Sequence, residues 1–132
     1  MLSGEYTGST KIAVNVRQIG PQAAILDIEG EVSAFAESAL MDAYQRAGAD
    51  GAEAIVLNFD KLDYMNSSGI GLLVTLLIRA NRNGHRLLAY GLSEHYQHIF
   101  ELTRLNEAIR VYDSEAAALA AADIEGTTIG KR

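Results

Sequence analysis

The chain has 132 residues, 48% of them apolar, which is long and apolar enough for one domain with its own hydrophobic core. A formal net charge of −6 argues against a nucleic acid or an anionic membrane as the partner, and the absence of cysteine excludes disulfides, thiolate catalysis and cysteine-based zinc sites. The first residues lack a signal-peptide pattern and the longest apolar run, residues 70–78, is shorter than the ~20 residues that cross a bilayer, so we expect a cytoplasmic domain without direct membrane insertion.

Strands and helices are expected to alternate along most of the chain. Apolar and polar residues alternate in the first strand, and a turn at Gly20 and Pro21 returns the chain antiparallel into the second strand. The apolar run at residues 54–59 lacks this alternation, which is typical of a parallel strand covered on both faces. In chain order we expect a strand over residues 11–19, a strand over 23–28, a helix over 35–47, a strand over 54–59, a helix ending near 82, a strand over 86–90, a helix from 94, a strand over 108–112 and a helix over 115–122.

Two of these helices have a recognisable start or face. Residues 30–33 are expected to form a loop whose Ser33 caps the following helix, and Phe35 is expected to lie on the apolar side of that helix. The helix that follows the third strand is broadly apolar, with Thr75, Arg79 and Arg82 on a narrow solvent-facing side. Core packing explains most of its apolar residues, and the alternative is an apolar surface near its start that meets a partner.

The order of the elements from residue 23 onward predicts a mostly parallel sheet with right-handed crossovers and the first strand at an edge. We expect a single α/β domain over residues 11–122. The polar segment at residues 1–10 is expected to be a flexible N-terminus, and residues 123–132 a flexible C-terminal tail.

The segment before the most apolar helix combines a cap, two hydroxyls and two glycines. Asn66 is a good N-cap residue, which would make Ser67 the first helical residue and Ser68 the second. An anion is stabilised there, because the first turn of a helix has free N–H groups and the positive end of the dipole. Gly69 and Gly71 each cost about 1 kcal/mol relative to alanine, which suggests close approach by the neighbouring strand or by a partner protein. A plain capping cluster with packing glycines would explain the same residues.

Segment 57–72, which contains Asn-Ser-Ser-Gly-Ile-Gly, resembles the anti-sigma factor antagonist family, the bacterial STAS domain. Three further segments resemble the same family in order and spacing, at residues 28–32, 98–103 and 111–117. The resemblance runs from about residue 11 to residue 122. It implies a STAS-like fold, with a mostly parallel sheet of four to five strands, an antiparallel edge strand and helices packed mainly on one side.

The resemblance implies a protein-binding switch and not an enzyme. Members of the family bind an anti-sigma factor that is also a serine kinase, and thereby regulate sigma-factor-dependent transcription. The kinase phosphorylates the first serine of the pair, here Ser67, the phosphorylated form releases its partner, and a phosphatase resets it. We expect a monomer or weak dimer without a cofactor or a metal. The residues implied to contact the partner surround this serine: Ser33, Asn66, Ser68, Gly69, Ile70 and Gly71.

Two other functions stay open. Asn66 and Ser33 stand where the family usually carries acidic residues, and Arg104 stands where a glycine is common. The first alternative is therefore a STAS binding module that is not phosphorylated, as a scaffold subunit of a signalling assembly or the soluble subunit of a membrane transport complex. The second is an enzyme that uses the serines with Asp60 and Asp63, although no base for a nucleophile is evident.

Overall fold

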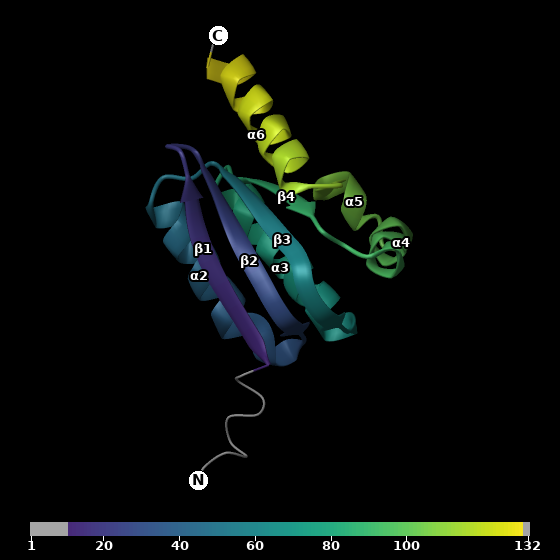
Figure 1. The fold of residues 1–132 in the computed structure, drawn as a ribbon. Helices are drawn as coiled ribbons and strands as arrows, with labels where there is room; N and C mark the ends of the chain where they lie inside the picture. The colour runs from purple at the N-terminus through teal and green to yellow at the C-terminus, as the bar shows by residue number, and fades with distance from the viewer. Residues whose placement is uncertain (1–10, 131–132) are drawn as a thin grey trace.

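The computed structural model describes the backbone of residues 11–130 and the side chains of residues 11–123. The chain forms a five-stranded sheet in the order β1-β2-β3-β4-β5, with helices on both faces (Figure 1). The elements in chain order are β1 (Ile12–Ile19), β2 (Ala23–Val32), η1 (Ala34–Ala36), α2 (Glu37–Ala49), β3 (Ala54–Met65), α3 (Ser67–Arg82), β4 (Arg86–Tyr90), α4 (Glu94–Leu102), α5 (Leu105–Ala108), β5 (Arg110–Tyr112) and α6 (Glu115–Gly130).

β1 lies at one edge of the sheet and pairs antiparallel with β2, as the turn at Gly20 and Pro21 predicts. The pairs β2–β3, β3–β4 and β4–β5 are all parallel. Helices make the crossovers between these parallel strands, so the α/β fold expected from the alternation of elements is confirmed.

The central strands are buried on both faces. Leu26 of β2 and Leu57 of β3 belong to the larger core cluster, under α2 and α3. Ile25 and Val56 belong to a second cluster, under α6 on the opposite face. Because successive residues of a strand point to opposite faces, a strand in this position needs an unbroken apolar run. α6 covers its face only in part, and Asn15 of β1 is exposed there.

β2 and β3 are longer than the sequence predicts, since they end at Val32 and Met65. The prediction of a loop at residues 30–33 is wrong. Gly30 lies within β2 with a φ of 103°, and a Cβ there would overlap the carbonyl oxygen of Lys11. The register between β2 and β3 shifts twice in this region, as at β-bulges, so the charged part of β3 stays paired although it resembles a loop.

The last strand is shorter than the predicted 108–112, because the helix α5 ends at Ala108. Arg104 joins α4 to α5 with a φ of 63°. This is the left-handed region that favours glycine. It agrees with the glycine that is common at this position in the family that the sequence resembles.

α6 continues to Gly130, beyond the helix end expected near residue 122. Gly126, which favours a helix end in a sequence, does not interrupt it. Residues 1–10, expected to be flexible, lie outside the described residues, and the domain limits stay a prediction.

Candidate functional site

α3 begins at the residue that the sequence predicts. Asn66 is the N-cap, and its side-chain Oδ1 accepts a hydrogen bond from the backbone N–H of Gly69 at 2.9 Å. The N–H of Ile70 donates to the carbonyl oxygen of Asn66 at 2.9 Å, which closes the first turn. Ser67 is therefore the first residue of α3, and the capping role of Asn66 is confirmed.

Ser67 and Ser68 are both exposed on the first turn of α3. This turn contains no acidic residue that would repel an anion. Backbone N–H groups at a helix start lack intrahelical acceptors, and the helix dipole adds partial positive charge. A negative group attached to Ser67 would thus lie in solvent, at the end of α3 that stabilises it.

The two glycines of α3 have different surroundings. A Cβ on Gly69 would overlap the carbonyl oxygen of Val32, so the end of β2 requires a glycine there. A Cβ on Gly71 would meet no atom of the described residues within 4 Å. The neighbouring strand therefore explains Gly69, whereas the described part of the fold gives no reason for Gly71.

Phe35 lies on η1, whose N-cap is Ser33 and which packs beside α3. The carbonyl oxygen of Val32 accepts a hydrogen bond from the N–H of Asn66 at 3.3 Å, which joins the end of β2 to the start of α3. Ser33 Oγ accepts from the N–H of Phe35 at 3.3 Å, so it caps η1 and not α2. The expectation that Phe35 is apolar core is wrong, since it is 79% exposed and Ala36 takes the buried position instead.

The outer face of α3 continues the line that starts at Ser67. Gly71, Val74 and Ile78 follow at helical spacing, and all are exposed, Val74 to 39% and Ile78 to 51%. The sequence predicts a narrower solvent face around Thr75, because most of the apolar residues of this helix are expected to lie in the core. Their helical spacing from Ser67 is the feature of the sequence that places Val74 and Ile78 on the same face of the helix as this serine.

The carboxylates considered for catalysis are exposed on the last part of β3. Asp60 lies close to Gly91, and its backbone N–H donates to Asn58 Oδ1 at 2.9 Å. Asp63 lies in a hollow that Glu31 also lines. Among the described residues, no group of three or more His, Cys, Asp or Glu side chains could hold a metal ion. In the same part of the chain, no helix combines the length and the apolar character needed to cross a membrane.

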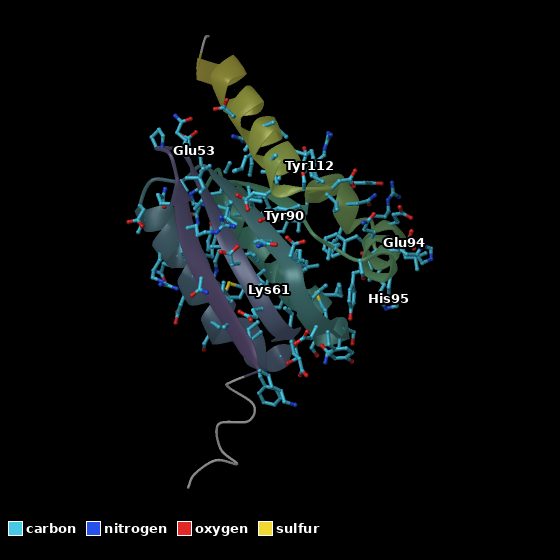
Figure 2. The ribbon with its side chains drawn as sticks, viewed as in Figure 1. Glu53, Lys61, Tyr90, Glu94, His95 and Tyr112 are labelled. Carbon is cyan, nitrogen blue, oxygen red and sulfur yellow. The ribbon has the colours of Figure 1, made fainter. Side chains whose placement is uncertain are left out.

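A polar network joins α6 to the sheet face opposite α2 and α3. Arg17 donates from Nε to Asp27 Oδ2 at 2.6 Å and from Nη2 to Glu115 Oε1 at 3.0 Å. Tyr90, labelled in Figure 2, donates to the same oxygen of Glu115 at 2.8 Å. Asn58 donates to Asp27 Oδ1 at 2.7 Å. The network thereby joins the first turn of α6 to four strands of the sheet, β1 to β4.

Both carboxyl groups of this network have a lowered pKa. Burial raises the pKa of Asp27, but hydrogen bonds from Arg17 and Asn58 outweigh burial, so the net shift is downward. Arg17 and then Tyr90 lower the pKa of Glu115. Burial and then Glu115 raise the pKa of the Tyr90 hydroxyl. Charged carboxylates and a neutral phenol are therefore the stable forms at neutral pH.

Replacing Arg17 with methionine is expected to lower the free energy of unfolding by about 1–2 kcal/mol at pH 7. The lowered pKa values mean that this stabilisation is present above the unfolded values of about 4 and is lost as the pH falls through the folded values. The difference between wild type and Arg17→Met should therefore shrink at about pH 3, as measured by urea denaturation.

Arg104→Met is the matched control, because it removes an exposed ion pair with Glu107. It should change the free energy of unfolding by less than about 0.5 kcal/mol. An undiminished effect of Arg17→Met in acid would contradict the stabilising role of the network.

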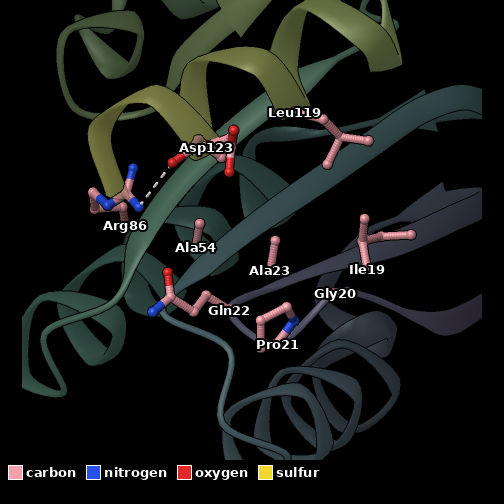
Figure 3. Close-up of a pocket in the computed structure, with 10 residues that line it drawn as sticks. Ile19, Gly20, Pro21, Gln22, Ala23, Ala54, Arg86, Leu119 and Asp123 are labelled. Carbon is pink, nitrogen blue, oxygen red and sulfur yellow. Dashed lines mark hydrogen bonds between the residues drawn. The ribbon is translucent and has the colours of Figure 1, made fainter. Parts of the chain in front are cut away.

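A pocket of about 280 Å³ lies between α6 and the amino ends of β2 and β3 (Figure 3). Ala23 and Ala54 begin these strands, whereas Ser67 follows the carboxyl end of β3. Arg86 lines the pocket and donates from Nη2 to the carbonyl oxygen of Ala122 at 3.3 Å. The pocket and Ser67 therefore lie at opposite ends of the sheet.

Comparison with known proteins gives a family match and a curated relative. The STAS domain family matches residues 13–118. The anti-sigma-B factor antagonist of Staphylococcus aureus is 30% identical over 84 residues, which cover 64% of this chain and 78% of that protein.

Solved structures share the fold at lower identity. The Bacillus cell fate determinant SpoIIAA in its phosphorylated form has a TM-score of 0.65 and 19% identity, with coverage of 83% of this chain and 99% of that one. A sulfate transporter family protein from Wolinella succinogenes has a TM-score of 0.67 and 19% identity, with coverage of 82% and 90%. These two structures support the fold alone.

Proposed function

The chain belongs to the STAS domain family, and from this premise we propose that it is an anti-sigma factor antagonist. It binds an anti-sigma factor that is also a serine kinase, and so frees a sigma factor for transcription. The kinase phosphorylates Ser67, the phosphorylated domain releases its partner, and a phosphatase restores the binding form. The domain acts in the cytoplasm as a monomer or weak dimer and catalyses no reaction itself.

The exposed position of Ser67 at the first residue of α3 is the observation that carries this proposal. The cap is made by the side chain of Asn66, so a phosphate on Ser67 removes no capping hydrogen bond. Phosphorylation adds about −1.5 to −2 charges. At a helix start this charge is stabilised, so its effect falls on the bound partner and not on α3.

The proposed contact surface surrounds Ser67. Ser68 and Gly71 are exposed within it, and the half-buried Ser33 and Ile70 lie at its border, as does Asn66. Gly69, which is buried against the end of β2, supports this surface from beneath.

Mass spectrometry tests the modification after incubation with ATP and the kinase-type anti-sigma factor of the same organism. One phosphate is expected, on Ser67. Ser67→Ala should abolish phosphorylation, and Ser68→Ala, which changes the neighbouring exposed hydroxyl, should retain it. A phosphate on another residue would contradict the assignment of the site. Binding without any phosphate would favour the alternative function.

That alternative is a STAS binding module without phosphorylation. It is favoured by Asn66, which stands where the family usually carries an acidic residue. A sulfate transporter family protein has the same fold, so the fold is compatible with this role. In this role the domain is a scaffold subunit of a signalling assembly or the soluble subunit of a membrane transport complex. Recovery of a transporter ATPase and no kinase in a pull-down would support it.

A further inference from the structure

Exposed apolar side chains concentrate on the elements around Ser67. Among the described residues the large exposed ones are Phe35, Tyr64, Val74, Ile78 and Leu102. Tyr64 precedes Ser67 at the end of β3, Phe35 is on η1, and Val74 and Ile78 are on α3. Only Leu102, at the C-terminal end of α4, lies outside η1, β3 and α3. Such a concentration of exposed apolar side chains is typical of a contact with another protein.

The outer face of α3 is uncharged from Ser67 to Ile78. Along this line Ser67, Gly71, Val74 and Ile78 succeed one another, although charged residues make up 21% of the chain. Val74 and Ile78 are β-branched, which is unfavourable in a helix, so helix stability does not explain their presence at exposed positions. An apolar partner surface fits this face better than a charged one.

Gly71 lies in the middle of this face without a structural reason. Glycine is costly in a helix interior relative to alanine. No atom of the described residues would contact a Cβ at this position, in contrast to Gly69. A bare backbone at an exposed helix position allows another backbone to come close.

We propose that an apolar face of the anti-sigma factor lies along the outer face of α3. Its backbone comes closest at Gly71, and its apolar side chains cover Val74 and Ile78. This inference rests on the proposed function and extends the contact surface by two helical turns beyond Gly71. Because Ser67 lies one turn from Gly71 on the same line, a phosphate there would meet the edge of the contact, where its charge would lose water.

Titration of the unmodified domain with the purified anti-sigma factor of the same organism tests the inference. Ile78→Glu is expected to raise the Kd at least ~10-fold, because it places a charge in the apolar contact. Leu102→Glu is the matched control: it makes the same kind of change at a side chain that is 70% exposed, on α4. It should change the Kd less than ~2-fold.

Gly71→Ala is a second variant, which adds one methyl group to the contact. It should weaken binding without lowering the midpoint of thermal unfolding. Thermal unfolding of all three variants checks that the fold is retained.

The outcomes separate this inference from the proposed function. Equal affinity of wild type and Ile78→Glu would overturn the docking face and leave the proposed function intact. An equal loss in Leu102→Glu would also overturn it, because the effect would not be specific to α3. If the wild-type domain fails to bind the anti-sigma factor, the proposed function is overturned together with this inference.

Discussion

A phosphate on Ser67 is expected to lower the affinity of the domain for its anti-sigma factor by about 100-fold or more, which is about 2.7 kcal/mol of binding free energy. The same phosphate should change the free energy of unfolding of the isolated domain by less than about 1 kcal/mol. The two effects differ because the free N–H groups of α3 stabilise the charge in the unbound domain, whereas the bound partner would bury it. Ser67 is exposed, so phosphorylation displaces no core side chain.

Titration of the phosphorylated and unmodified domains with the anti-sigma factor measures the first quantity, and urea denaturation measures the second. Ser67→Asp should reproduce part of the loss, since it adds one negative charge. Ser93→Asp is a matched control, because Ser93 is also an exposed residue at a helix start and aspartate caps a helix as well as serine does. A similar loss of affinity in both variants would show that net charge, and not the position of Ser67, controls binding.

Gly69→Ala is expected to lower the free energy of unfolding by about 3 kcal/mol. The added methyl group would overlap the carbonyl oxygen of Val32, and that oxygen is backbone that can yield only if β2 and α3 move apart. The end of β2 and the start of α3 both belong to the surface around Ser67, so Gly69→Ala should also weaken partner binding. The expected loss is larger than the gain of about 1 kcal/mol that alanine brings to a helix.

Gly71→Ala is the matched control for this prediction, because it makes the same change two residues away. It should raise the free energy of unfolding by up to about 1 kcal/mol, since a methyl group there meets open space. Urea denaturation of the two variants in parallel measures the difference. Equal stability of the two variants would contradict the close packing of α3 against the end of β2.

Much of the candidate site can be predicted from the sequence because local chemistry determines it. Asn66 is a cap in any helix that starts at Ser67, and its hydrogen bond to the N–H of Gly69 spans only three residues. The antiparallel position of β1 follows from the short turn at Pro21 for the same reason. The sequence leaves open whether the neighbouring strand or a partner protein explains the glycines of this segment. Only the structure shows that Gly69 packs against Val32.

The features that the sequence did not predict depend on tertiary pairing. Gly30 favours a loop by composition, yet pairing with β1 and β3 on its two sides keeps it in β2. The charged end of β3 is a strand because two register shifts keep it paired with β2. Phe35 fits the periodicity of α2, but η1 places it out of phase with the buried side of that helix. Exposure of Val74 and Ile78 likewise depends on which side of α3 meets the sheet.

α6 offers an attachment point for labels and tethers that spares the surface around Ser67. Figure 1 shows its C-terminal end projecting past one end of the sheet, whereas α3 starts at the opposite end. A dye or an immobilising linker attached after Gly130 would leave Ser67 accessible to the proposed kinase and phosphatase in surface-based kinetic assays. A fusion at the start of β1 would not, because Ile12 pairs with Gly30 and so lies at the same end of the sheet as η1.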